Sequence, residues 1–274
     1  MSSVKTISFD LSHLHFRLAQ RCVSYSIQNL HLNSYIGHTI VIDGPVYTRC
    51  LGCRSVYKKL YKRGYCYLCF NNLAVCDLCV LQPHRCHFHL NTCREPDWGI
   101  KHCFQPHYVY LSYTDKVKIG ITRVHNLTTR MMHQGAIACL PVLLVPSRKI
   151  AGLIEISVKE HFSMTTAWKG MLNSRDVDAD VLYASRDLFY REFDHNAYQH
   201  VIPTWYKDVI RISYPLSCDV TTSILQLPIH DRLVGLKGMY MIFENGVFNM
   251  RRLAGVTCEM TIFDDACGAS MMTA

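Results

Sequence analysis

The chain has 274 residues, of which 49% are hydrophobic and only 18% are charged, so it can bury a core and a disordered chain is excluded. Its formal net charge of +8 favours an acidic partner, with nucleic acid ahead of an anionic membrane. The longest apolar run, 136–145, is short and broken by Pro141, so no membrane-spanning segment is expected. No secretory signal is visible, and free thiols fit a reducing compartment, so a cytoplasmic location is expected.

Residues 1–49 are predicted to be a β-rich N-terminal segment. Apolar and polar residues alternate between positions 7 and 18, as they do in half-buried strands. A further strand is predicted at 35–43, ended by Asp43-Gly44-Pro45. No chemistry is evident in this segment.

Residues 50–106 are predicted to be a zinc-binding module, because 50–103 holds nine of the 14 cysteines. Two C-x-x-C pairs open the module: Cys50 with Cys53, and Cys66 with Cys69. Their separation fits one tetrahedral Zn²⁺ held by four thiolates. Two redox dithiols are the alternative, which is disfavoured because no βαβ pattern surrounds them.

A second group of cysteines and histidines follows at once and holds more candidate ligands than one ion needs. Four thiols are predicted to bind a second structural Zn²⁺: Cys79, Cys86, Cys93 and Cys103. His87 or His102 can substitute for one of them, and buried free thiols are the alternative to a metal. Structural zinc sites are closed, so both ions are expected to stabilise the fold.

The segment between the two C-x-x-C pairs, 54–65, carries five cations and no acid. The cations are Arg54, Lys58, Lys59, Lys62 and Arg63. Tyr57, Tyr61 and Tyr65 are interleaved with them. Cations that meet phosphates, beside rings that stack on bases, predict a nucleic-acid-binding surface. A solvated ribbon tip is the alternative.

Residues 107–175 are predicted to form a small α/β core. The expected order is a strand at 108–113, a turn at 114–116, a strand at 117–122, a helix at 127–133, a strand at 139–145 and a helix from Ser147. The three-residue turn would pair Tyr110 with Gly120, and Tyr110 would then share a face with Lys118. Arg123 is added to the expected nucleic-acid-binding cations.

Residues 163–210 are predicted to be mostly helical. Residues 176–265 are predicted to be a C-terminal segment that is mixed helical and then β-rich from Arg211, and 266–274 are predicted to be a loose tail. The runs 238–243 and 247–252 flank an Asn-Gly pair, which is a strong hairpin signal. The two β-rich ends are predicted to form one domain around the central modules. The expected fold class is therefore α+β, with zinc-ribbon modules, a small α/β core, and β-rich N- and C-terminal segments.

Nearly the whole chain is similar to an uncharacterised microbial family, the domain-of-unknown-function 2797 family. The matching stretches lie at 64–70, 93–99, 109–111, 117–123, 133–136 and 235–238. The resemblance implies a zinc-binding intracellular protein, and the family carries no settled activity.

Residues 107–173 also resemble the GIY-YIG nuclease module, which opens with a hairpin carrying its two named tripeptides. Tyr108-Val109-Tyr110 stands in the first place and Lys118-Ile119-Gly120 in the second, where the family usually has tyrosine instead of Lys118. The family's helical arginine and metal-binding glutamate, the latter behind a small residue, match Arg130, Glu155 and Ala151; Asn173 matches a later asparagine. The resemblance implies catalysis by Tyr110, Lys118, Arg130 and Glu155, with Mg²⁺ at Glu155.

The leading hypothesis is a zinc-stabilised nucleic-acid-binding protein with a GIY-YIG-like core, which the resemblance extends to a divalent-metal-dependent endonuclease. A non-catalytic zinc-ribbon adaptor that docks RNA or protein, or an RNA-modifying enzyme of another type, is the alternative. No P-loop, Rossmann fingerprint or G-x-S-x-G motif is present, which disfavours enzymes of those kinds. The sequence distinguishes neither DNA from RNA nor one oligomeric state from another.

Overall fold

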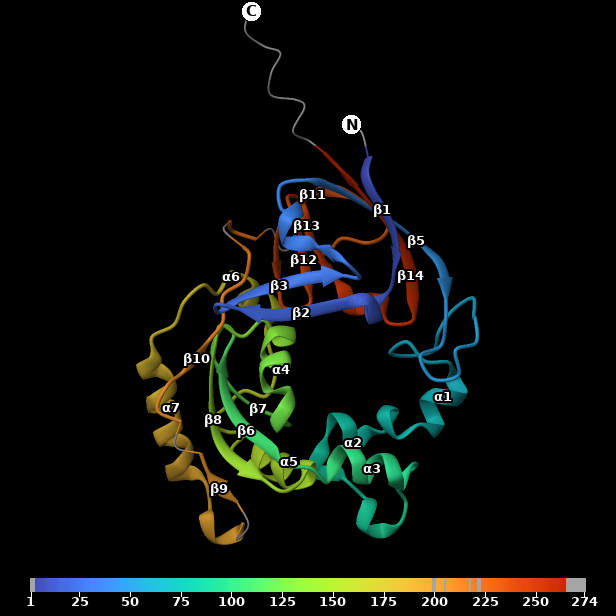
Figure 1. Cartoon of the computed structure of the whole chain (residues 1–274). Helices are drawn as coiled ribbons and strands as arrows, with labels where there is room; N and C mark the ends of the chain where they lie inside the picture. The colour runs from blue at the N-terminus through green and yellow to red at the C-terminus, as the bar shows by residue number, and fades with distance from the viewer. Residues whose placement is uncertain (1–2, 199–200, 205, 217, 221–222, 265–274) are drawn as a thin grey trace, which may run out of the picture. The chain divides into compact units, whose positions relative to one another are not determined.

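The chain folds as two units, which a computed structural model describes over residues 3–198, 201–204, 206–216, 218–220 and 223–264 (Figure 1). Unit 1 comprises residues 1–70 and 214–274, and unit 2 comprises 71–213. The segment 50–106, predicted as one zinc-binding module, is therefore divided between the units after Phe70. The predicted tail at 266–274 lies outside the described residues.

The secondary structure is mixed, as the predicted α+β class requires. The strands are β1 Ser3–Phe9, β2 Leu14–Ala19, β3 Cys22–Ile27, β4 Leu30–His31, β5 Thr39–Thr48, β6 His107–Tyr113, β7 Val117–Arg123, β8 Ala138–Val145, β9 Ile202–Pro203, β10 Ile210–Arg211, β11 Ile229–Lys237, β12 Tyr240–Phe243, β13 Gly246–Asn249 and β14 Val256–Phe263. The α-helices are α1 Tyr67–Asn72, α2 Leu78–Leu81, α3 Pro96–Cys103, α4 Leu127–Gln134, α5 Arg148–Ser157, α6 Trp168–Asn173 and α7 Ala179–Glu192. In the described part of the chain, no helix has the length and apolar character needed to cross a membrane.

Unit 1 is built on a six-stranded sheet in the order β1-β14-β5-β11-β12-β13. Strand β14 lies between β1 and β5, so the first and last strands of the chain share one sheet (Figure 1). The prediction that the two β-rich ends form one domain is confirmed by this pairing. A second sheet, β2-β3-β4, belongs to the same unit.

The predicted strand at 35–43 is wrong at both ends. Residues 32–35 form a 3-10 helix, and β5 begins at Thr39. Asp43-Gly44-Pro45 does not end the strand, because a register shift opposite Cys258 absorbs Gly44, whose φ is +139°. The strand then continues to Thr48. The predicted C-terminal hairpin is confirmed, with Phe243 paired to Gly246.

Unit 2 is organised around the antiparallel sheet β10-β8-β6-β7, with β9 paired to β8. The predicted turn and register of its first hairpin are confirmed: Tyr113 pairs with Val117, and Tyr110 pairs with Gly120. Residues 163–210, predicted to be mostly helical, contain α6 and α7 but also β9 and β10.

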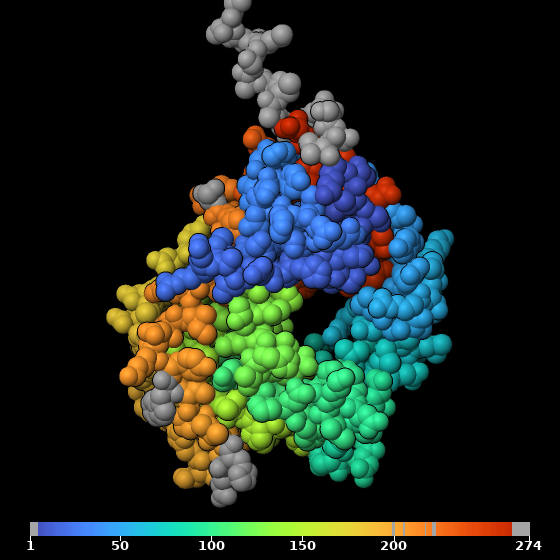
Figure 2. Space-filling model, viewed as in Figure 1, coloured from blue at the N-terminus to red at the C-terminus, as the bar shows by residue number. Residues whose placement is uncertain are grey.

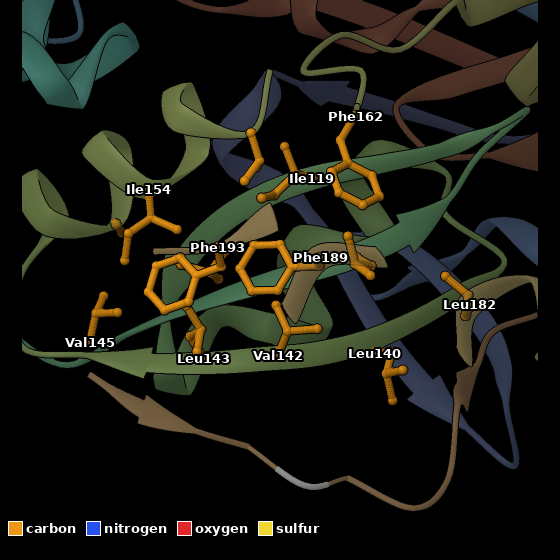
Figure 3. Close-up of a cluster of buried hydrophobic side chains, with 14 of the residues drawn as sticks. Ile119, Leu140, Val142, Leu143, Val145, Ile154, Phe162, Leu182, Phe189 and Phe193 are labelled. Atoms are coloured by element: carbon orange, nitrogen blue, oxygen red, sulfur yellow. The ribbon is translucent and has the colours of Figure 1, made fainter. Parts of the chain in front are cut away.

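One face of this sheet carries the core of unit 2, which packs against α5 and α7 (Figure 3). Ile119 of β7 and Ile154 of α5 lie in this core with Phe189, whose ring stacks on Phe193 at 5.5 Å between centroids. Fully burying each such side chain stabilises the fold by about 1.5–3 kcal/mol. Helix α5 ends at Ser157, and Phe162 is buried in the same core beyond the end of the helix.

Candidate metal and nucleic-acid-binding sites

The first thiol group has the geometry of a four-thiolate zinc site. The Sγ atoms of Cys50, Cys53, Cys66 and Cys69 all lie within 4.8 Å of one another. Those of Cys53 and Cys66 are 3.9 Å apart. Zn–S bonds of about 2.3 Å in a tetrahedron place sulfurs about 3.8 Å apart. The group therefore fits zinc.

Backbone amides point at these sulfurs. The amide of Cys66 donates to the Sγ of Cys50 at 3.2 Å, and the amide of Cys69 donates to the Sγ of Cys66 at 3.5 Å. Gly64 forms the turn before Cys66 with a φ of +86°, and a Cβ there would lie 2.7 Å from Cδ1 of Leu51. Glycine is required at this turn for both reasons.

Hydroxyl groups beside the thiols favour thiolates. Hydrogen bonds from Ser55 lower the pKa of Cys53 to about 6, and the Tyr57 hydroxyl lowers the pKa of Cys66. Burial raises the pKa of Cys69 to about 12. Zinc binds the thiolate, so two of these ligands are already favoured in the form that binds metal.

The five predicted nucleic-acid-binding cations of unit 1 are all exposed, and in Figure 2 their segment, light blue to cyan, forms part of the visible surface. Lys62 places its ammonium 5.1 Å from the centroid of the Tyr61 ring, which meets Tyr67 edge-on at 5.2 Å. Both tyrosines are exposed. The segment thus presents charge and aromatic faces together. Arg123, the sixth predicted cation, is half-buried at the end of β7 in unit 2.

A groove of ≈ 330 Å³ lies beside this segment in unit 1. It is lined by Pro45, Val46, Tyr47, Thr48, Val56, Tyr57 and Lys58. The guanidinium of Arg49 lies 5.3 Å from the centroid of the Tyr47 ring. Sequence reasoning missed Tyr47, because it precedes the cysteine pairs and only the fold of β5 brings it to the groove.

The four cysteines of the predicted second site line one cavity of ≈ 20 Å³ in unit 2. A cavity of this volume can hold one small bound atom or water. Phe88 and Phe104, whose ring centroids are 4.6 Å apart, form part of its wall. Gly99 of α3 permits close packing there, because a Cβ would lie 3.2 Å from the ring of Phe88 and 3.4 Å from the Sγ of Cys93.

The ligand atoms that lie within 4.8 Å of one another in this region are those of Asp77, Cys79 and His87, and the four sulfur atoms of the predicted second site do not form such a group. The Asp77 carboxylate already accepts from the Cys79 amide at 3.2 Å and pairs with Nε of Arg94 at 2.8 Å. Nδ1 of His87 lies 2.7 Å from the Thr92 hydroxyl. Nε2 of His87, which these interactions leave available to a metal, lies 3.5 Å from Oδ2 of Asp77.

Tyr110, the first residue matched to the nuclease module, is fully buried. Its hydroxyl donates to Oε1 of Gln134 at 3.0 Å, and burial raises the pKa of the phenol, which therefore stays protonated. Lys118 is 3% exposed and donates to the Thr166 hydroxyl. Neither side chain is placed at the protein surface.

The other two residues matched to the module are accessible. Arg130 is exposed on α4, and Glu155 is half-buried on α5. Burial raises the pKa of Glu155 to about 7, and Arg130 opposes this most strongly, followed by Lys118 and Arg148. Arg130 also interacts electrostatically with Tyr110, opposing the rise in the phenol's pKa. The fold therefore brings all four predicted residues within electrostatic range. Asn173, the fifth match, lies exposed at the end of α6.

Comparison with known proteins identifies one relationship. The model of the family described as "Protein of unknown function (DUF2797)" matches residues 37–258. No curated protein and no solved structure matches the chain. The matched range includes both thiol groups, the basic segment and the residues matched to the nuclease module.

Proposed function

Since the chain belongs to the DUF2797 family, whose description states no activity, we propose a function from its own residues. The protein is a zinc-stabilised nucleic-acid-binding protein, and the segment 54–65 of unit 1 contacts the phosphates. One observation carries this proposal: the five cations of that segment are all exposed and lie between the two halves of a thiol group that fits zinc. A metal at the base of the segment would hold its cations in a fixed arrangement.

The chemistry of the segment favours phosphate contacts with stacking beside them. Cations bind the backbone of either nucleic acid without reading its sequence. The exposed rings of Tyr61 and Tyr67 add faces on which unpaired bases can stack.

The first experiment is recovery of nucleic acid from the full-length protein purified at low salt. Bound nucleic acid is extracted, treated separately with RNase and DNase, and sized. We expect nucleic acid to co-purify and to dissociate as salt is raised. Zinc-loaded protein with no affinity for RNA or DNA at low salt would contradict the proposal.

A second candidate function, divalent-metal-dependent phosphodiester hydrolysis in unit 2, is favoured by the electrostatic grouping of Arg130 and Glu155. In this proposal Arg130 contacts the phosphate and Glu155 holds Mg²⁺. Tyr110 and Lys118 are buried, so neither can contact the substrate directly as the resemblance implies. We assign both residues a role in positioning the groups that do.

Glu155 fits a cation because, among the described residues, its carboxylate forms no hydrogen bond or ion pair. Bound Mg²⁺ would supply charge to the phosphate oxygens. Arg130 would stabilise the negative charge that develops there. Water would add its oxygen to phosphorus, the P–O ester bond would break, and the leaving oxygen would take up a proton.

The test compares Glu155→Gln with Glu160→Gln, an exposed glutamate beyond the end of the same helix. Zinc-loaded proteins are incubated with single- and double-stranded DNA and RNA, with and without Mg²⁺. We expect cleavage by wild type and Glu160→Gln only with Mg²⁺, and none by Glu155→Gln, with binding unchanged in all three. Cleavage that persists in Glu155→Gln, or an inactive wild type, leaves unit 2 without this activity.

A further inference from the structure

The start of helix α5 carries a half-buried arginine, Arg148, whose buried nitrogen calls for an anion. Arg148, the first residue of α5, donates from Nη2 to the carbonyl of Val80 at 2.6 Å. Its Nε is buried, and within the described residues it has no hydrogen-bond partner. A buried donor left without a partner costs about 1–3 kcal/mol, and more when it is charged. Negative charge near the guanidinium would offset this cost.

Thiols provide that negative charge if they ionise. Arg148 lines one cavity together with Cys79, Cys86 and Cys103. The same three cysteines, together with Cys93, line a second cavity. Four thiolates around one Zn²⁺ carry a net charge of −2. The Arg148 guanidinium beside them would offset part of that charge and offer N–H donors to the sulfurs.

Three residues other than cysteine that could bind a metal here already have partners, and the two histidines among them keep Nε2 for a metal. Asp77 caps α2 and pairs with Arg94, and His87 bonds Thr92. The ring of His102 stacks on Trp98 at 4.4 Å, with Nδ1 2.8 Å from the Trp98 carbonyl.

We propose that Cys79, Cys86, Cys93 and Cys103 bind a second structural Zn²⁺, and that Arg148 faces this site as its counter-charge and thereby fixes the start of α5. The sequence left histidine open as a ligand, and we assign all four positions to sulfur because these four thiols line one cavity. This inference does not depend on nucleic-acid binding or cleavage.

The same helix touches the cysteine-rich segment at a second point. Helix α5 packs on the 3-10 helix Pro83–Arg85, which lies between Cys79 and Cys86. A Cβ on Gly152 would lie 2.6 Å from Cβ of Pro83 and 2.7 Å from the amide nitrogen of His84. A metal that orders this segment therefore also orders the helix that carries Glu155.

The first test is the zinc content of full-length variants. Wild type is expected to hold two zinc ions, Cys66→Ser and Cys93→Ser one each, and the double variant none. Asp77→Asn and His87→Asn are expected to keep two. A wild type with one zinc overturns the second site. Loss of a zinc in Asp77→Asn and His87→Asn, with two kept in Cys93→Ser, overturns the ligand set.

Because Cys93→Ser could fail to fold, a second experiment identifies the metal ligands in the wild-type protein. Zinc is replaced by Co²⁺, whose absorption distinguishes four sulfur ligands from mixed sulfur, nitrogen and oxygen. We expect two cobalt ions per chain with an all-sulfur spectrum. A mixed contribution from one of the two ions would contradict the assignment.

The part of Arg148 is tested with Arg148→Met, and its neighbour Lys149→Met is the matched control, since Lys149 contacts His89 near the surface. A chelator is expected to remove the second zinc from Arg148→Met at about 10–100-fold lower concentration than from the control. Amide hydrogen exchange across 148–157 should rise when that zinc leaves, while exchange in β14 stays unchanged. Equal zinc retention in the two variants would overturn the counter-charge.

Discussion

The ring of Tyr110 occupies the space where a side chain at Gly120 would lie. The two residues face each other across β6 and β7, and a Cβ on Gly120 would come within 2.7 Å of both Cζ and the hydroxyl oxygen of Tyr110. The absence of a side chain at Gly120 therefore lets the Tyr110 ring lie flat on the sheet and reach Gln134.

Gly120→Ala is expected to destabilise unit 2 by about 1–3 kcal/mol, because the added methyl group forces the buried ring to move. Chemical denaturation measures the change in the free energy of unfolding. Tyr110→Phe, which removes only the bond to Gln134, serves as the control and should cost about 1 kcal/mol. If Gly120→Ala unfolds at the same denaturant concentration as wild type, the position of the Tyr110 ring does not require the absence of a side chain at residue 120.

Cys66→Ser is expected to lower the zinc content by one ion and to unfold the segment 50–70, because a structural zinc site supplies folding free energy. Metal analysis and proteolysis of the full-length protein measure both effects. Cys22→Ser, at a half-buried cysteine of the same unit outside the thiol groups, should keep its zinc and its resistance to protease. Unchanged zinc in Cys66→Ser would exclude this thiol as a ligand.

The triple variant Lys58→Ala, Lys59→Ala and Lys62→Ala should bind nucleic acid more weakly and with a flatter dependence on salt. The slope of log K against log[salt] should fall by about one unit per lost phosphate contact. The control replaces Lys5, Arg17 and Arg21, three exposed cations of the same unit, and makes the same change in net charge. If the two variants show the same slope of log K against log[salt], the basic segment acts only through the net charge of the protein.

His107 makes unit 2 sensitive to acid. It is 2% exposed, and burial lowers its pKa to about 4. The unfolded chain, with an ordinary pKa near about 6.5, binds more protons between these values, so the stability present above pH about 6.5 is lost as pH falls toward about 4. The loss amounts to about 2–3 kcal/mol.

His107→Asn removes the titrating group, and its amide can still donate to the Gln105 carbonyl that Nδ1 of His107 approaches at 2.6 Å. Urea midpoints at neutral and acidic pH should therefore differ less in the variant than in wild type. Zinc release at low pH affects both proteins alike, so the difference between them isolates His107. Parallel loss of stability in both would contradict the shifted pKa.

Local spacing was enough to predict the first thiol group and the central hairpin. Cys50, Cys53, Cys66 and Cys69 are brought together by short turns, so their ligand geometry follows from positions close in the sequence. The pairing of Tyr110 with Gly120 follows from turn length, because the register of a two-stranded hairpin is set at its turn.

Burial and charge pairing were decided only by the tertiary structure, because they depend on side chains far apart in the sequence. Tyr110 and Lys118 match a pattern of exposed catalytic groups, yet packing from later segments buries both. Arg148 gave no signal as a partner of the cysteines, since its distance from Val80 is set by how α5 folds back. Sequence spacing thus determined which residues could bind metal. The fold determined which of them are exposed to solvent, line a cavity or lie near a charged side chain.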